Sequence, residues 1–229
     1  MAEPPMNAPE VVQVLALQVD LAWRRLPQAQ REEDLDAFRQ LVNKTAGEVH
    51  TLAYATAGLR ADAHLVLIRF AGSLAALQES NSALLCTGVG RAMRVAHSFV
   101  GLLRSSRYVK RAGSQEQGLL AGERAAYLIV YPFTKTHDWY RLSGDARQGM
   151  MNEHIRIGHD FPQVRQLLAY STGLDDQEFI VAYETDDLAA FQDLVTALRE
   201  TEARRYTLRD QPILTAIYRP LDEALQQLG

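Results

Sequence analysis

Several features that mark whole classes of protein are scarce in this chain of 229 residues. The single cysteine, Cys86, can form neither an internal disulfide nor a cysteine-based metal cluster, which favours a reducing cytoplasm. Because Cys86 lies in an apolar run, we expect it to be a small buried residue. The formal net charge of −4 provides no basic surface for nucleic acid. No apolar run approaches the ~20 residues that cross a bilayer, and the N-terminus lacks the pattern of a signal peptide. We therefore expect a soluble, cytoplasmic protein with neither nucleic-acid nor membrane partners.

Short catalytic motifs are equally scarce. The chain has no HxxxH or CxxC metal-binding pair, no GxSxG nucleophile elbow and no P-loop. The stretch GVGRAM, residues 88–93, lacks the third glycine of a dinucleotide-binding turn and follows an expected helix rather than a strand.

The chain does contain enough apolar residues, 47%, to bury a sizeable core, and their spacing predicts alternating strands and helices. Strands are expected in 11–23, 96–104, 125–133 and 204–220, hairpins in 51–70 and 167–184, and helices in 32–47, 73–85, 144–158 and 186–200.

An internal repeat is visible in the letters. YATAGL at 54–59 matches YSTGL at 170–174, and SLAALQE at 73–79 matches DLAAFQD at 187–193 at nearly the same distance. Each half gives the order β-α-β-β-α-β, so we expect an α+β protein made of duplicated ferredoxin-like halves. We place the halves at 1–110 and 125–229, joined by a linker loop at 111–124.

Two histidines five positions apart lie in the helix expected at 144–158 or directly after it. On a helical projection His154 falls in the middle of an apolar arc, whereas His159 falls at its margin. We expect His154 to point into the protein and His159 to be mostly solvated. A buried histidine is more often a hydrogen-bonded core residue than a ligand, and no second metal ligand lies at a conventional spacing. If His154 binds a metal, it binds alone, as an axial ligand of a macrocycle does.

The second half resembles the chlorite dismutase family, which includes the coproheme decarboxylases. The resemblance lies in YPFTKTHDWY, MMNEHIRIGHDFP, YSTGLDDQEF and ETEARRY, in this order, and extends more weakly through GLRADAHLVLIRF and SRYVKR. It implies two ferredoxin-like halves that form one barrel within the chain, and assembly into homopentamers. It also implies a haem protein: haem b or Fe-coproporphyrin III, with His154 as the axial ligand of the iron.

The resemblance assigns roles to further residues. Glu202 matches the carboxylate that accepts a hydrogen bond from the proximal histidine, which fixes the tautomer of the ligand. Tyr108 and Trp139 match aromatic residues of the haem pocket. Arg205 lies beside the position of an arginine that binds a propionate in some decarboxylases, and we include it on that basis.

Three positions distinguish the branches of the family. Chlorite dismutases carry a distal arginine where the ungapped count gives Gln166, a residue that many coproheme decarboxylases share. Arg165 is adjacent and would point to the opposite face of a regular strand, although a one-residue bulge would exchange the two. Tyr131, followed by proline, matches the tyrosine that the decarboxylases oxidise to a radical. Lys135 matches their propionate-binding lysine.

The resemblance therefore implies a coproheme decarboxylase, which uses hydrogen peroxide to convert two propionates of Fe-coproporphyrin III to the vinyl groups of haem b. Its catalytic residues would be Tyr131, Lys135 and Gln166. Two alternatives stay open: a chlorite dismutase, which converts chlorite to chloride and dioxygen and requires Arg165 in the pocket, and a haem-binding protein with weak peroxidase activity.

Overall fold

The computed structural model describes residues 10–106, 108, 119 and 122–229, in which the strands of each unit pair antiparallel in a mixed α+β fold. The chain divides into two compact units: Met1–Leu103 with Ala216–Gly229, and Arg104–Thr215. Most of the expected linker at 111–124 lies outside the described residues. Within the described part of the chain, no helix is long and apolar enough to cross a membrane.

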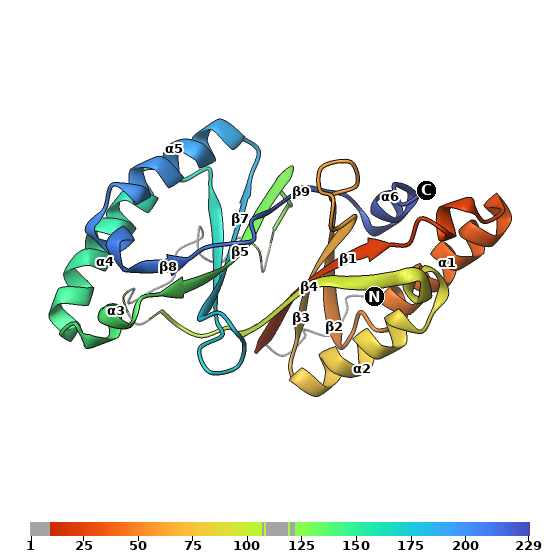
Figure 1. Ribbon diagram of the computed structural model, residues 1–229, viewed down its shortest axis with the longest axis horizontal. Helices are drawn as coiled ribbons and strands as arrows, with labels where there is room; N and C mark the ends of the chain where they lie inside the picture. The colour runs from red at the N-terminus through yellow and green to blue at the C-terminus, as the bar shows by residue number, and fades with distance from the viewer. Residues whose placement is uncertain (1–9, 107, 109–118, 120–121) are drawn as a thin grey trace. The chain divides into compact units, whose positions relative to one another are not determined.

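The first unit contains a sheet in the order β4-β1-β3-β2, with α1 and α2 on one of its faces (Figure 1). Strand β1 pairs with β4 over its whole length and with β3 from Val11 to Leu17, which explains why its nine apolar-rich residues are almost completely buried. Its elements are β1 (Val11–Val19), η1 (Trp23–Arg25), α1 (Gln28–Lys44), β2 (Val49–Ala55), β3 (Leu65–Ala71), α2 (Leu74–Leu85), η2 (Gly88–Ala92) and β4 (Met93–Leu102).

The C-terminal segment belongs to this first unit, which differs from the expected division of the chain at 125–229. Strand β9 (Leu214–Tyr218) pairs with β2, and the short helix α6 (Leu221–Gln226), which the sequence did not predict, follows it. Ala224, Leu225 and Leu228 are buried in the same apolar cluster as Trp23 and Phe38. Burial of these side chains fastens the end of the chain to the first core.

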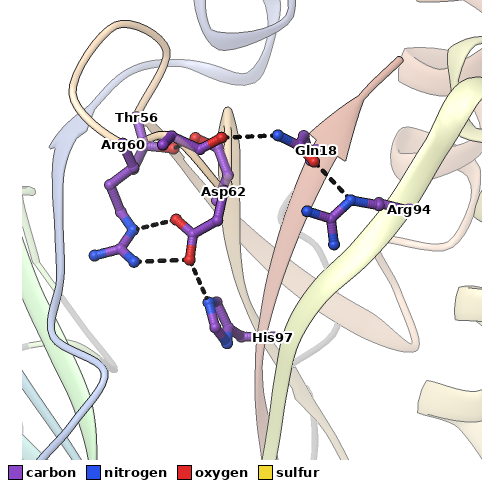
Figure 2. Close-up of polar contacts among 8 residues, drawn as sticks. Gln18, Thr56, Arg60, Asp62, Arg94 and His97 are labelled. Atoms are coloured by element: carbon purple, nitrogen blue, oxygen red, sulfur yellow. Dashed lines mark hydrogen bonds and ion pairs between the residues drawn. The ribbon is translucent and has the colours of Figure 1, made fainter.

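The loop between β2 and β3 is fixed by a polar cluster (Figure 2). Asp62 accepts two hydrogen bonds from the Arg60 guanidinium, at 2.7 and 2.8 Å, and lies 2.8 Å from His97 Nε2 on β4. The bonds from Arg60, and then that with His97, hold the pKa of the Asp62 carboxyl well below its usual range. Gln18 of β1 donates to the Ala61 carbonyl at 2.8 Å, so the loop is attached to two strands of its own sheet.

The second unit contains a sheet in the order β6-β7-β5-β8, and α4 and α5 contact each other on one side of it (Figure 1). Ser143 caps α4 by accepting the amide of Ala146, and Asp187 caps α5 in the same way. The elements of the unit are β5 (Tyr127–Lys135), α3 (His137–Arg141), α4 (Gly144–His159), β6 (Arg165–Tyr170), β7 (Phe179–Thr185), α5 (Leu188–Arg199), η3 (Glu202–Tyr206) and β8 (Thr207–Arg209).

Two local expectations need correction. Cys86 is exposed rather than buried, and it is the C-terminal cap of α2. The stretch HDWYR forms the short helix α3, which was not predicted, and this helix buries Trp139.

Candidate functional site

One face of the second sheet carries three polar side chains in register. Tyr131 of β5 pairs with Val181 of β7, and Gln166 of β6 pairs with Tyr183 of β7. Because side chains alternate along a strand, Tyr131, Gln166 and Tyr183 point to the same face of the sheet. Tyr183 and Tyr131 pack there against residues of α4 and α5, so this is the face that the helices cover.

Arg165 points to the opposite face. The ladder between β6 and β7 runs without a bulge, and Arg165 pairs with Glu184. Its guanidinium lies 3.3 Å from the Glu184 carboxylate, which is fully buried, and donates to the Glu123 carbonyl at 2.5 Å. The register thus selects Gln166 as the β6 side chain on the face of Tyr131.

His154 projects from α4 and is half-buried, whereas His159 is exposed, as its place on the helix predicted. Burial, followed by the positive charge of Lys135, lowers the pKa of His154 to about 4. The imidazole is therefore neutral at physiological pH, which is the form that binds a metal. The influence of Lys135 on its pKa also indicates that β5 brings that ammonium close to the helix.

Lys135 itself lies at the end of β5 in a poorly hydrated position. Its ammonium donates to the Ala203 carbonyl at 3.3 Å and lies 4.3 Å from the centre of the Trp139 ring. The described residues supply no ion pair to it within 4.0 Å. Its pKa is lowered to about 8, chiefly by burial; the charge of Glu178 opposes the shift and that of Arg204 contributes to it. A partly buried ammonium that the described residues leave without a carboxylate partner is suited to receive an anionic ligand.

The short helix η3 places its two arginines differently. Arg205 is exposed and forms a surface ion pair with Glu202 at 3.3 Å. Arg204 is more buried and contacts Asp210 at 2.5 Å, and its charge influences the pKa values of both Lys135 and Tyr131. The arginine whose charge reaches Lys135 and Tyr131 is thus Arg204, the neighbour of the Arg205 that the resemblance indicated.

Glu202 is not bonded to His154 in the described part of the chain, because its carboxylate is exposed and pairs with Arg205. Their expected hydrogen bond remains a prediction. Trp139 is buried and packs on Tyr206 at 5.7 Å between ring centres. Tyr108 is half-buried, and its carbonyl accepts a hydrogen bond from Gln148 of α4 at 3.4 Å.

The first unit provides an internal reference for this site. Leu15 and Val19 occupy the positions in β1 that Tyr131 and Lys135 occupy in β5, as the two strand registers show. Trp23 follows Val19 at the spacing at which Trp139 follows Lys135, and Phe38 of α1 follows Trp23 at the spacing at which His154 follows Trp139. The four first-unit counterparts are all buried in one apolar cluster: Leu15, Val19, Trp23 and Phe38.

The same comparison extends to how deeply the helices are buried. Helix α1 buries Asp34, Phe38 and Val42, whereas α4, which is described over its whole length, has no buried residue. Yet α4 carries Met150 and Met151 beside His154, and a well-packed core would bury such side chains. The second unit therefore has His154, Tyr131 and Lys135 where the first unit has buried apolar residues. Helix α4 is also less buried than its counterpart α1.

These residues fit a flat, largely apolar ligand that carries an electrophilic metal and carboxylates. The neutral His154 provides one metal ligand, the apolar residues of α4 provide contact area, and Lys135 with Arg204 provides positive charge for carboxylates. The hydroxyl of Thr136, next to Lys135, is buried without a hydrogen-bond partner among the described residues, which leaves a further polar group for a ligand. An iron porphyrin has this combination of properties.

Comparison with known proteins agrees with this geometry. Residues 31–219 match the family described as chlorite dismutase, and the chain belongs to this family. It is 35% identical over 164 residues to a coproheme decarboxylase of Mycolicibacterium smegmatis, covering 71% of this chain and 70% of the relative. It is 28% identical over 209 residues to a chlorite dismutase of Ideonella dechloratans, covering 88% and 73% of the two chains.

Solved structures show the same likeness. The chlorite dismutase of Candidatus Nitrospira defluvii in complex with imidazole superposes with a TM-score of 0.88 at 29% identity, covering 97% of this chain and 96% of the other. The family resemblance seen in the second half is thus confirmed, and the mixed α+β fold matches structures of the family.

Proposed function

We propose that the chain is a coproheme decarboxylase, which uses hydrogen peroxide to convert two propionates of Fe-coproporphyrin III to vinyl groups and so forms haem b. The observation that carries the proposal is the grouping of a neutral His154 with Lys135, above the sheet face that presents Tyr131. The likeness to the coproheme decarboxylase of Mycolicibacterium smegmatis supports it. A haem-binding protein without turnover would not require an oxidisable tyrosine at this position.

The substrate supplies its own iron, which reacts with peroxide and becomes the oxidant. Tyr131 then gives up an electron and its phenolic proton, and the resulting radical takes a hydrogen atom from a substrate propionate. Loss of a second electron releases carbon dioxide and leaves a vinyl group. Each propionate consumes one peroxide and one proton and yields one carbon dioxide and two water molecules, so the step balances. A second round completes haem b.

The remaining residues have positioning roles in this proposal. His154, on α4, would bind the iron of the substrate. Gln166 lies on the sheet face of Tyr131, where its uncharged amide could donate a hydrogen bond to peroxide. Trp139 and Tyr108 provide aromatic walls. Glu202 accepts a hydrogen bond from His154 once the iron is bound, which requires its exposed ion pair with Arg205 to open; such pairs are worth at most ~1 kcal/mol.

We also infer from the common element order of the two units that each is a ferredoxin-like copy, and that the copies form one barrel within a pentamer. Sedimentation velocity measures the number of subunits directly. The proposed cellular location is the cytoplasm, where the single exposed Cys86 would stay reduced.

The proposed activity is tested by mixing the purified protein with ferric coproporphyrin III, adding peroxide in steps and following porphyrin masses. We expect stepwise conversion through a monovinyl product to haem b. A parallel reaction with haem b and chlorite, followed by an oxygen electrode, tests the alternative. Bleaching without vinyl products, combined with rapid oxygen release, would reject the decarboxylase in favour of a chlorite dismutase; that activity would have to do without Arg165, whose side chain pairs with Glu184.

Arg204 and Arg205 form a matched pair for testing how the substrate carboxylate is held. We expect Arg204→Ala to raise the KM for coproporphyrin by about tenfold, because one charge-assisted contact is lost. Arg205→Ala should change it by less than about twofold, because the Arg205 side chain is 74% exposed, against 36% for Arg204. Steady-state kinetics of the two variants decide, and a larger effect for Arg205 would contradict the assignment.

Lys135 should make binding depend on pH. Its pKa of about 8 in the free protein means that the cation is present below this value and is lost as the pH rises through it. We expect the affinity for ferric coproporphyrin III, from Soret titrations, to fall several-fold between pH 7 and 9. Lys135→Arg should remove this decline because a guanidinium stays charged. An unchanged decline in that variant would assign the effect to another group.

A further inference from the structure

Tyr131 is not isolated on its face of the sheet. Its ring lies 6.2 Å from that of Tyr183, at an angle of 35°, on the neighbouring strand β7. Burial, followed by the neighbouring Tyr183 phenol, raises the pKa of Tyr131 well above its usual value, and burial also raises the pKa of Tyr183. The two phenols are thus neighbours on the sheet face that α4 and α5 cover.

Tyr183 lies deeper in the protein than Tyr131. It forms an apolar cluster with Val164 and Leu194 and packs against Phe191 with 5.3 Å between ring centres. Its backbone partner Gln166 is uncharged. The counterpart of Tyr183 in the first unit is Arg69, which is fully buried and hydrogen-bonded to Asn81 and Ser80. The fold therefore does not require a phenol at this position.

We propose that Tyr183 is a second redox-active tyrosine, which returns a hydrogen atom to Tyr131 after Tyr131 has been oxidised. This inference rests on the proposed function, which supplies the oxidant. In the exchange the Tyr183 O–H bond breaks, the Tyr131 O–H bond forms, and the unpaired electron moves to the ring of Tyr183. No atom or charge leaves the pair.

The surroundings of Tyr183 favour this neutral exchange. Transfer of an electron alone or of a proton alone would leave a charge among Val164, Leu194 and Phe191, where no described ionisable side chain compensates it. Transfer of both together avoids that cost. After the exchange the unpaired electron lies farther from solvent, and Tyr131 is again able to react. The pair would therefore hold an oxidising equivalent when no propionate is in place, and limit damage to the porphyrin.

The experiment places 3-aminotyrosine, which is more easily oxidised than tyrosine and has a distinct radical spectrum, at position 183. The protein is loaded with ferric coproporphyrin III and mixed with peroxide, and the radical is followed by absorbance and electron paramagnetic resonance. The same is done with Tyr131→Phe as a second change. A control carries 3-aminotyrosine in place of Tyr170, which packs on Phe179 instead. Porphyrin masses are measured in parallel for the wild-type protein.

We expect an aminotyrosyl radical at position 183 that disappears when Tyr131→Phe is added, and none at position 170. In addition, Tyr183→Phe should still form vinyl products but bleach the porphyrin several-fold faster. Vinyl formation by the wild-type protein without a radical at position 183 would overturn the inference and leave the proposed function intact. A radical at 183 that persists in Tyr131→Phe, or an equal one at 170, would also overturn it. Absence of vinyl products from the wild-type protein would reject the proposed function itself.

Discussion

Tyr131→Phe is expected to stop vinyl formation while leaving porphyrin binding intact. Phenylalanine keeps the ring that packs with Tyr183 and the apolar residues of α4 and α5, but it has no O–H bond from which an electron and a proton can leave together. We expect the rate of decarboxylation to fall by roughly 10³-fold, within the range for loss of one essential proton-transfer group. The affinity for ferric coproporphyrin III should change by less than about twofold, because the iron ligand and Lys135 are untouched.

The protonation state of Tyr131 supports this expectation. Burial, followed by the neighbouring Tyr183 phenol, holds the pKa of Tyr131 well above the ordinary value, so the phenol stays protonated throughout the neutral range. Oxidation of Tyr131 must then release a proton together with the electron. Between pH 6 and 8, decarboxylation should therefore show no step due to deprotonation of Tyr131.

The measurement combines a Soret titration with mass spectrometry of the porphyrin after peroxide addition. Tyr170→Phe is the matched control, because Tyr170 is a half-buried tyrosine at the end of β6 that packs on Phe179, and its loss should leave turnover unchanged. Vinyl products at more than about a tenth of the wild-type rate from Tyr131→Phe would contradict the role of this residue. Loss of binding in the same variant would instead assign it a structural role.

Much of the fold could be predicted because its signals are local. The repeated letters at 54–59 and 170–174 each precede a strand of a hairpin, and the spacing of apolar residues gave the helices α1, α2, α4 and α5. The element α3 escaped prediction because five residues are too few to show a helical period. Helix α6 packs against residues of the first core that are about 200 positions earlier in the sequence, and no local pattern predicts such a contact.

The site was only partly predictable for a related reason. The apolar arc around His154 indicated which of two histidines faces inward, but the sequence alone could not choose between Gln166 and Arg165, because a single bulge would reverse them. The regular pairing of Arg165 with Glu184 makes this choice. Arg204 and Arg205 are adjacent in the chain, and only the direction of each side chain from η3 distinguishes them.

Replacing His154 has the other large expected effect, and here the ligand itself can be restored. His154→Gly should weaken binding of ferric coproporphyrin III by at least about 100-fold, because the other imidazole of α4, that of His159, is exposed. Peroxide-dependent decarboxylation should fall with it. His159→Gly is the matched control: it removes an exposed histidine from the same helix and should leave both properties near the wild-type values.

Imidazole added to the His154→Gly protein should restore part of the Soret spectrum and of the turnover, since it can enter the space that the side chain leaves. Structural damage would not be repaired by a small base, so rescue distinguishes loss of the iron ligand from misfolding.

The pH dependence of binding gives an independent check. Burial holds the pKa of His154 at about 4, so the neutral, ligating form persists down to that value and is lost only as the pH falls through it. In the rescued protein, by contrast, protons compete with iron for free imidazole at near-neutral pH, because the base is no longer desolvated by the protein. Binding that weakens at a higher pH after rescue than in the wild-type protein would identify His154 as the iron ligand, and identical pH profiles would exclude it.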